Sequence, residues 1–170
     1  LRTVQVFGLD TNFDLQNETV TLNGTTPVNL VNTYIRIYRM IGITAGSGER
    51  NAGSITCRIQ SGGTTGAIIS IGNNQTLMCH YTIPNNYTGY MYSGYATTNK
   101  GGDGEVIFWV RPYGEIFQIK QKIDIYQSTY SRPFIVPLRS EAKSDLKVTA
   151  TTTNNNSNIK VGFDLLLVED

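Results

Sequence analysis

Short runs in which apolar and polar residues alternate recur along the whole chain, and this feature limits the fold more than any other. A period of two residues is typical of a strand with one buried face, whereas an amphipathic helix repeats every 3.6 residues. Helical periodicity is nearly absent; only "SEAKSD" at 140–145 resembles a helical turn. The alternation predicts strands at 3–8, 18–23, 27–44, 53–60, 66–71, 75–83, 87–98, 104–113, 115–126, 133–137, 145–152 and 159–168.

The stretch "ETVTLNGTTPV" at 18–28 carries the best short hairpin signal. Its turn residues are Asn23 and Gly24, and both central residues of a type I′ turn need a positive φ. We expect Val20 and Leu22 to pack inward, while the threonines between them face water or a neighbouring molecule.

Two other stretches show the same organisation. In "YIRIYRMIGI" at 34–43, strict alternation places Ile35, Ile37 and Ile41 on one face of a strand. In "RPYGEIF" at 111–117, a proline and a glycine predict a hairpin corner.

Twelve short strands are more than a single open sheet usually carries. We therefore predict an all-β fold, a two-layer antiparallel β-sandwich of jelly-roll type. No linker, repeat or shift of composition divides the sequence, so we expect residues 1–170 to form one domain. The first residue is Leu1 rather than Met, and we expect an N-terminal segment to be missing.

The charge balance argues against two classes of partner. Charged residues make up 16% of the chain and the formal net charge is +1. Such a chain has no bulk field that attracts nucleic acid or an anionic membrane. Its apolar runs are also far shorter than the ~20 residues that span a bilayer. We expect neither nucleic acid nor membrane as a partner.

Groups for catalysis are scarce. His80 is the only histidine, and its neighbour Cys79 points to the opposite face if both lie on a strand. A nucleophile–histidine pair would have to use His80. For Cys79 and Cys57, buried free thiols are favoured over a cross-strand disulfide. We expect no enzyme, no catalytic residues and no cofactor.

One acidic stretch, "DTNFDLQNE" at 10–18, is a candidate metal site. Asp10, Asn12 and Asp14 fall at alternate positions, as the first oxygen ligands of a calcium loop do. The sixth position is Leu15 instead of the usual Gly, and the twelfth is Thr21 instead of Glu. Asx turns beside a strand are therefore favoured, and we expect no bound metal.

The segment "YTIPNNYTGYMYSGY" at 81–95 concentrates tyrosines. Such side chains offer a large contact area at low entropic cost, and they suit a protein partner or a sugar ring. Packing between sheets or contact between subunits is favoured over glycan binding, with Trp109 as a further stacking candidate for a glycan. The candidate contact or glycan residues are Tyr87, Tyr90, Tyr92 and Tyr95.

Four stretches together resemble a known protein type. They are "FGLDTNFDLQNETVTLNGTTPV", "YRMIGITAGSGERNAGSIT", "IGNNQTLMCHYTIPNNYTGY" and "KSDLKVTATTTNNNSNIKVGFDLLLVED". In this order they resemble capsid-associated structural proteins of tailed bacteriophages, of the marine and cyanobacterial phage type. The resemblance consists of strand and turn signatures. It therefore indicates the fold and membership of the virion more specifically than the role within the particle.

The resemblance implies a non-enzymatic virion protein, of decoration or head-fibre type, assembled in the host cytoplasm. Its expected partners are other virion proteins and copies of itself. Few Lys and Glu residues keep its strands apart, which favours a homo-oligomer. The resemblance also favours a trimer over a dimer, with 87–95 as the contact. A carbohydrate- or receptor-binding module of a phage tail or fibre is the alternative.

Overall fold

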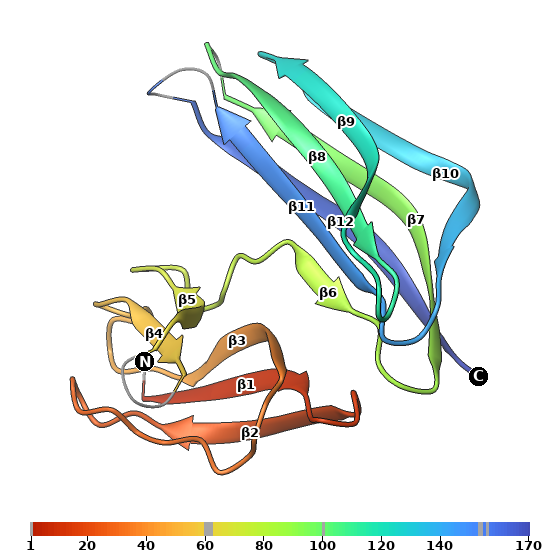
Figure 1. Ribbon diagram of the computed structural model, residues 1–170. Helices are drawn as coiled ribbons and strands as arrows, with labels where there is room; N and C mark the ends of the chain where they lie inside the picture. The colour runs from red at the N-terminus through yellow and green to blue at the C-terminus, as the bar shows by residue number, and fades with distance from the viewer. Residues whose placement is uncertain (1, 60–62, 100, 153–154, 156) are drawn as a thin grey trace. The chain divides into compact units, whose positions relative to one another are not determined.

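The computed structural model describes residues 2–59, 63–99, 101–152, 155 and 157–170. These residues form strands, turns and irregular segments without a helix, so the predicted all-β class is confirmed (Figure 1). The sequence predicted one domain; the chain divides into two compact units, Leu1–Met78 and Cys79–Asp170.

Twelve strands make up the described secondary structure. In chain order they are β1 (Thr3–Leu9), β2 (Leu15–Thr21), β3 (Arg36–Thr44), β4 (Ile55–Arg58), β5 (Thr65–Ile69), β6 (His80–Thr82), β7 (Tyr87–Thr98), β8 (Asp103–Arg111), β9 (Gln118–Tyr126), β10 (Thr129–Ser140), β11 (Asp145–Thr152) and β12 (Ile159–Glu169).

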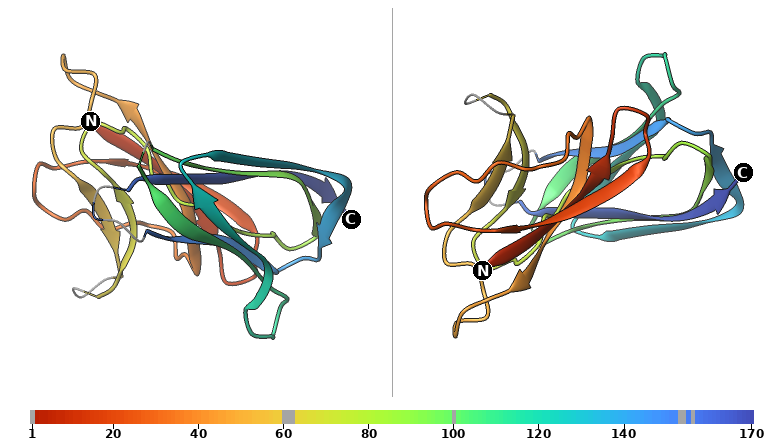
Figure 2. Two further views of the ribbon diagram at one scale, coloured as in Figure 1. Left: turned by 90° about the horizontal axis from the view of Figure 1, so that it is seen from above. Right: turned by 90° about the horizontal axis from the view of Figure 1, so that it is seen from below.

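The first unit contains a three-stranded antiparallel sheet and a hairpin. The sheet has the order β2-β1-β3. Strands β4 and β5 form the hairpin and lie side by side in Figure 2. One cluster of buried side chains joins them, since inward residues of both elements pack together. Burying each large apolar side chain contributes about 1.5–3 kcal/mol. The cluster consists of Val4, Val6, Met40, Ala67 and Ile69.

The hairpin predicted at 18–28 is wrong, although the inward positions are correct. Strand β2 pairs with β1, which precedes it, and 27–35 is irregular instead of continuing as a strand. A tight turn does form, but its centre is Gly24 with φ 57° and Thr25, closed by the Thr26 N–H on the Asn23 carbonyl at 2.9 Å. A β-turn signal therefore need not join two strands of one sheet.

A β-bulge changes the expected alternation in β3. Phe7 of β1 pairs with Arg39 and Gly8 pairs with Ile37, so Tyr38 is an extra residue. Both Ile37 and Met40 consequently contact the core cluster, although they are three residues apart. Strict alternation had placed Ile41 there instead.

The second unit is a sandwich of two antiparallel sheets. One has the order β10-β7-β12 and the other β6-β11-β8-β9. Their inner faces meet in two clusters, one built on Ile83, Met91, Val110 and Leu146, the other on Ala96, Val106 and Ile125. The predicted sandwich packing is thus present, while the jelly-roll connection of its strands stays a prediction.

Candidate interaction surfaces

The predicted tyrosines lie on β7, the central strand of the β10-β7-β12 sheet, but not on one face. Tyr87 packs on the inner cluster that contains Met91. Tyr90 and Tyr95 occupy alternate positions opposite to the core, and Tyr92 is an extra residue at a bulge. Tyr92 and Tyr95 are each 49% exposed. The outer face thus carries three of the four predicted residues.

Aliphatic side chains extend this surface on both neighbouring strands. On β12, Leu166 lies opposite Tyr90, and Val168 lies two residues further along the same face. On β10, Ile135 and Val136 are almost fully exposed where pairing with β7 is interrupted. Sequence reasoning missed these four. The run "LLLV" at 165–168 was a usable signal, because four consecutive apolar residues on a strand must cover both faces.

Trp109 belongs to the other sheet of the sandwich, so it shares no platform with the tyrosines of β7. Its indole N–H donates to the Thr149 hydroxyl at 2.8 Å. The Lys147 ammonium lies 5.5 Å from the Trp109 ring and 3.9 Å from the Phe117 ring. The Lys147 ammonium therefore makes cation–π contacts with the two rings that a sugar would otherwise stack on.

A partly buried ion pair fixes the end of the same sheet. The Arg111 guanidinium donates two hydrogen bonds to Asp145, one of them from Nε at 2.7 Å. The second carboxylate oxygen accepts the Thr82 hydroxyl at 2.5 Å. Arg111 also lies over the Phe117 ring, 4.6 Å from its centre. The pair joins β6, β8 and β11 and is a structural clamp.

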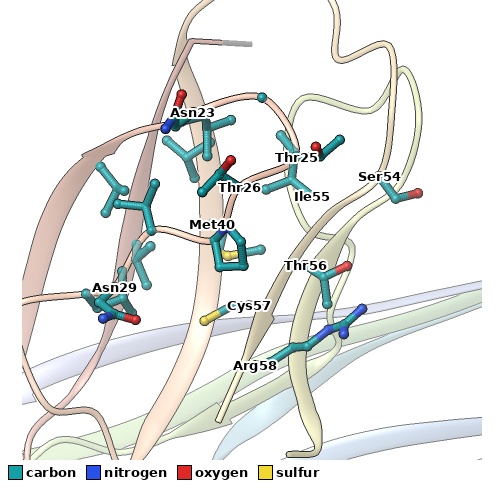
Figure 3. Close-up of a pocket in the computed structure, with 18 of the residues that line it drawn as sticks. Asn23, Thr25, Thr26, Asn29, Met40, Ser54, Ile55, Thr56, Cys57 and Arg58 are labelled. Atoms are coloured by element: carbon teal, nitrogen blue, oxygen red, sulfur yellow. The ribbon is translucent and has the colours of Figure 1, made fainter. Parts of the chain in front are cut away.

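The first unit contains a cleft of about 640 Å³, which no sequence signal predicted (Figure 3). Its walls are the irregular stretch after β2, residues 22–30, and the strand edge 54–59. Its floor is apolar and includes Val6 and Met40. A volume of this size lies within the range of ordinary binding pockets.

Strand β4 presents its edge to the cleft. Neighbouring side chains of a strand point to opposite faces, yet all six residues from Ser54 to Ile59 line the cleft. Cys57 points inward, and Figure 3 shows Arg58 pointing away from the floor. Arg58 is the only charged lining residue, and its side chain forms no hydrogen bond or ion pair with the described part of the chain.

Side chains of β2 hold the chain directly after the opposite wall, at residues 31–33. The Glu18 carboxylate accepts the Val31 and Asn32 backbone N–H groups at 2.8 and 3.1 Å. The Gln16 amide donates to the Thr33 carbonyl at 2.6 Å. No backbone hydrogen bond joins 22–30 to β4 among the described residues. The cleft is therefore a slot between two backbone segments.

Both cysteines are free thiols of intermediate exposure. Burial raises the pKa of Cys79 to about 11, and burial together with nearby Glu18 raises the pKa of Cys57. Thiols with raised pKa values stay protonated at neutral pH, and the protonated form is a poor nucleophile. His80 lies on β6 opposite Lys147.

The acidic stretch 10–14 forms an Asx turn. Asp10 Oδ1 accepts the backbone N–H groups of Asn12 and Asp14 at 2.8 and 2.9 Å. Within the ranges that the structure describes, no group of three or more His, Cys, Asp and Glu residues is arranged to hold a metal ion.

Comparisons with known proteins add no relative: no family model, curated protein or solved structure matches the chain. The described residues also contain no helix of the length and apolarity needed to cross a membrane.

Proposed function

We propose that this protein is a non-enzymatic structural component of a bacteriophage particle, associated with the capsid and assembling through copies of itself. The observation that carries the self-association is the outer face of the β10-β7-β12 sheet. There Tyr92, Tyr95, Leu166 and Val168 are each exposed by roughly half. Contiguous exposed apolar and aromatic surface is typical of interaction sites. The virion itself is proposed on the sequence resemblance.

The chemistry of the rest of the chain fits a binding role. The partly buried ion pair of Arg111 and Asp145 joins three strands, and burial keeps the two thiols protonated. Sheets joined in this way give a rigid surface, and rigid surfaces lose little entropy when they associate.

Quantitative mass spectrometry of purified phage particles tests the proposal. We expect this chain in stoichiometric amounts in the particles. Its absence from particles that package DNA normally would reject virion membership. A soluble phage protein of equal abundance in the infected cell serves as the control for contamination.

Glycan binding is the second candidate, because two half-exposed tyrosines on a sheet face suit stacking with sugar rings. A glycan array compares the unaltered chain with a Tyr92→Ala/Tyr95→Ala variant. Specific binding that disappears in the variant would favour the receptor-binding role. A uniformly blank array would leave the structural role as the better account.

A further inference from the structure

Several outermost strands of this protein are protected against pairing with another chain. Strand β9 carries the exposed charges Lys120, Lys122 and Asp124 along its length. Strand β10 contains Pro133 and Pro137 at the interruption of its pairing. Charges and prolines on an outermost strand are ordinary means of preventing edge-to-edge association.

The edge of β2 is covered in a different way. Side chains of this strand hold the following loop, since Glu18 accepts the N–H groups of Val31 and Asn32. Strand β6 has three residues, which is too short to pair extensively.

Two other outermost strands each have a segment without these protections. Strand β12 is outermost in its sheet, and its segment 165–168 is entirely apolar. Strand β4 pairs with β5 alone, and its other edge lines the cleft of the first unit. An unprotected edge beside an apolar slot is suited to the addition of one more strand.

The two edges also match in side-chain pattern. On β4, Ile55 and Cys57 face the core, and Arg58 lies on the opposite face. On β12, Leu166 and Val168 are exposed on one face. Glu169 follows Val168 directly, so it lies on the opposite face of the strand. Paired side by side, the exposed apolar residues would share one face, and the two charges would lie on the other face, where Leu165 and Leu167 pack on the core of their own sandwich.

Arg58 and Glu169 carry opposite charges that could pair with each other. Neither Arg58 nor Glu169 forms an ion pair or side-chain hydrogen bond within the described residues, and both are exposed. A carboxylate beside Arg58 would supply the partner that the cleft lacks.

We infer that the 165–169 segment of β12 in one copy docks in the cleft beside β4 of a second copy, with Glu169 next to Arg58. This inference rests on the proposed self-assembly and adds a second contact to the one on the outer face of β7. Because two different surfaces meet, the interface is heterologous, and repetition produces a ring or a filament. Backbone hydrogen bonds along β4 and the burial of Leu166 and Val168 stabilise it.

A disulfide experiment tests the contact directly, because Cys57 already lines the cleft. In a Cys79→Ser background, Cys57 is the sole thiol; Leu166→Cys or Val168→Cys adds a second one to the docking segment. A disulfide forms only where the two Cα atoms approach within about 7 Å. We expect mild oxidation to give a reducible ladder of dimers and higher multimers, linked between 57 and 166 or 168.

The matched control is Tyr126→Cys in the same background, since Tyr126 is exposed on β9. Cross-linking no greater than in this control, or a link within a single chain, overturns the docking arrangement.

A charge exchange provides a second test. We expect Arg58→Glu and Glu169→Arg each to weaken association about tenfold in analytical ultracentrifugation, because like charges then oppose each other. The double variant should recover most of the loss. If the chain associates but the disulfide between 57 and 166 or 168 does not form, or the double variant does not recover, this contact is rejected and the proposed self-assembly is not. A monomer at all micromolar concentrations rejects this inference, and particle mass spectrometry then decides virion membership independently.

Discussion

Gly162 of β12 lies beneath the ring of Tyr95 on β7, and a methyl group at position 162 would overlap that ring. The absence of a side chain there lets a large half-exposed ring lie flat on the sheet. Gly162→Ala should therefore push Tyr95 outward and change its environment. We expect altered tyrosine fluorescence or ring NMR shifts, with a loss of stability of about 0.5–1.5 kcal/mol for the displaced rotamer. Unchanged Tyr95 signals would contradict this geometry.

A second glycine contact lies in the core. A Cβ at Gly89 would overlap Ile83, which is fully buried, so Gly89→Ala should destabilise the sandwich by about 1–3 kcal/mol. Gly94 on the same strand is the matched control, because its added Cβ meets nothing closer than 4.0 Å. Urea unfolding compares the two variants. Equal changes in the two variants would show that overlap with Ile83 does not determine the effect.

The clamp between Arg111 and Asp145 should be worth far more than an exposed ion pair. Asp145→Ala removes the acceptor for both Arg111 and Thr82, and we expect a loss of about 2–3 kcal/mol. Glu141→Ala breaks the exposed pair with Arg139 and should leave the free energy of unfolding almost unchanged. Chemical denaturation measures both. Similar values for the two variants would mean that burial does not strengthen the clamp.

The raised pKa of Cys79 predicts a pH dependence. Unfolding returns this thiol to its ordinary pKa of 9.0, whereas the folded value is about 11. The unfolded state therefore releases the proton first, so the contribution is present below pH 9 and is lost as pH rises from about 9 to 11. We expect Cys79→Ala to flatten the stability profile in this window. An identical slope in the variant would contradict the assignment.

The tyrosine surface predicts the assembly state. Light scattering at micromolar concentration should show a homo-oligomer, with a trimer expected before a dimer, and not a monomer of 18.8 kDa. Tyr92→Ser/Tyr95→Ser should shift the mass toward the monomer, because the exposed rings are lost while the core remains. Tyr126→Ser, on the other sheet, should leave the mass unchanged. Equal effects of both variants would remove the outer face of β7 from the contact.

Asp10 provides a test of the calcium alternative. Its carboxylate accepts two backbone N–H groups, so Asp10→Ala should cost about 0.5–2 kcal/mol, while Asp10→Asn keeps an acceptor and should cost less. Millimolar calcium should leave the thermal midpoint of all three proteins unchanged. A rise in the unaltered chain that Asp10→Asn abolishes would establish a metal site.

Local patterns predicted the strands well where each strand has one buried face. The bounds of β7 and β11 agree with the alternation at 87–98 and 145–152. The pattern misled where pairing is decided by distant residues: 27–35 alternates as a strand does, but Glu18 and Gln16 hold its end as a loop. The cleft was beyond prediction for the same reason, because β4 and the 22–30 stretch are brought together only by tertiary packing.

The bulge at Tyr92 has a consequence for the length of β7. Met91, which faces the core, pairs with Leu165, and Ser93 pairs with Asp164. Because Asp164 and Leu165 are consecutive, β12 has no residue opposite Tyr92. Deleting Tyr92 would join two halves that are already in phase, with every inward side chain retained. The sandwich can therefore gain or lose one residue here at little cost to its interior, and the outer surface can be varied independently of the fold that supports it.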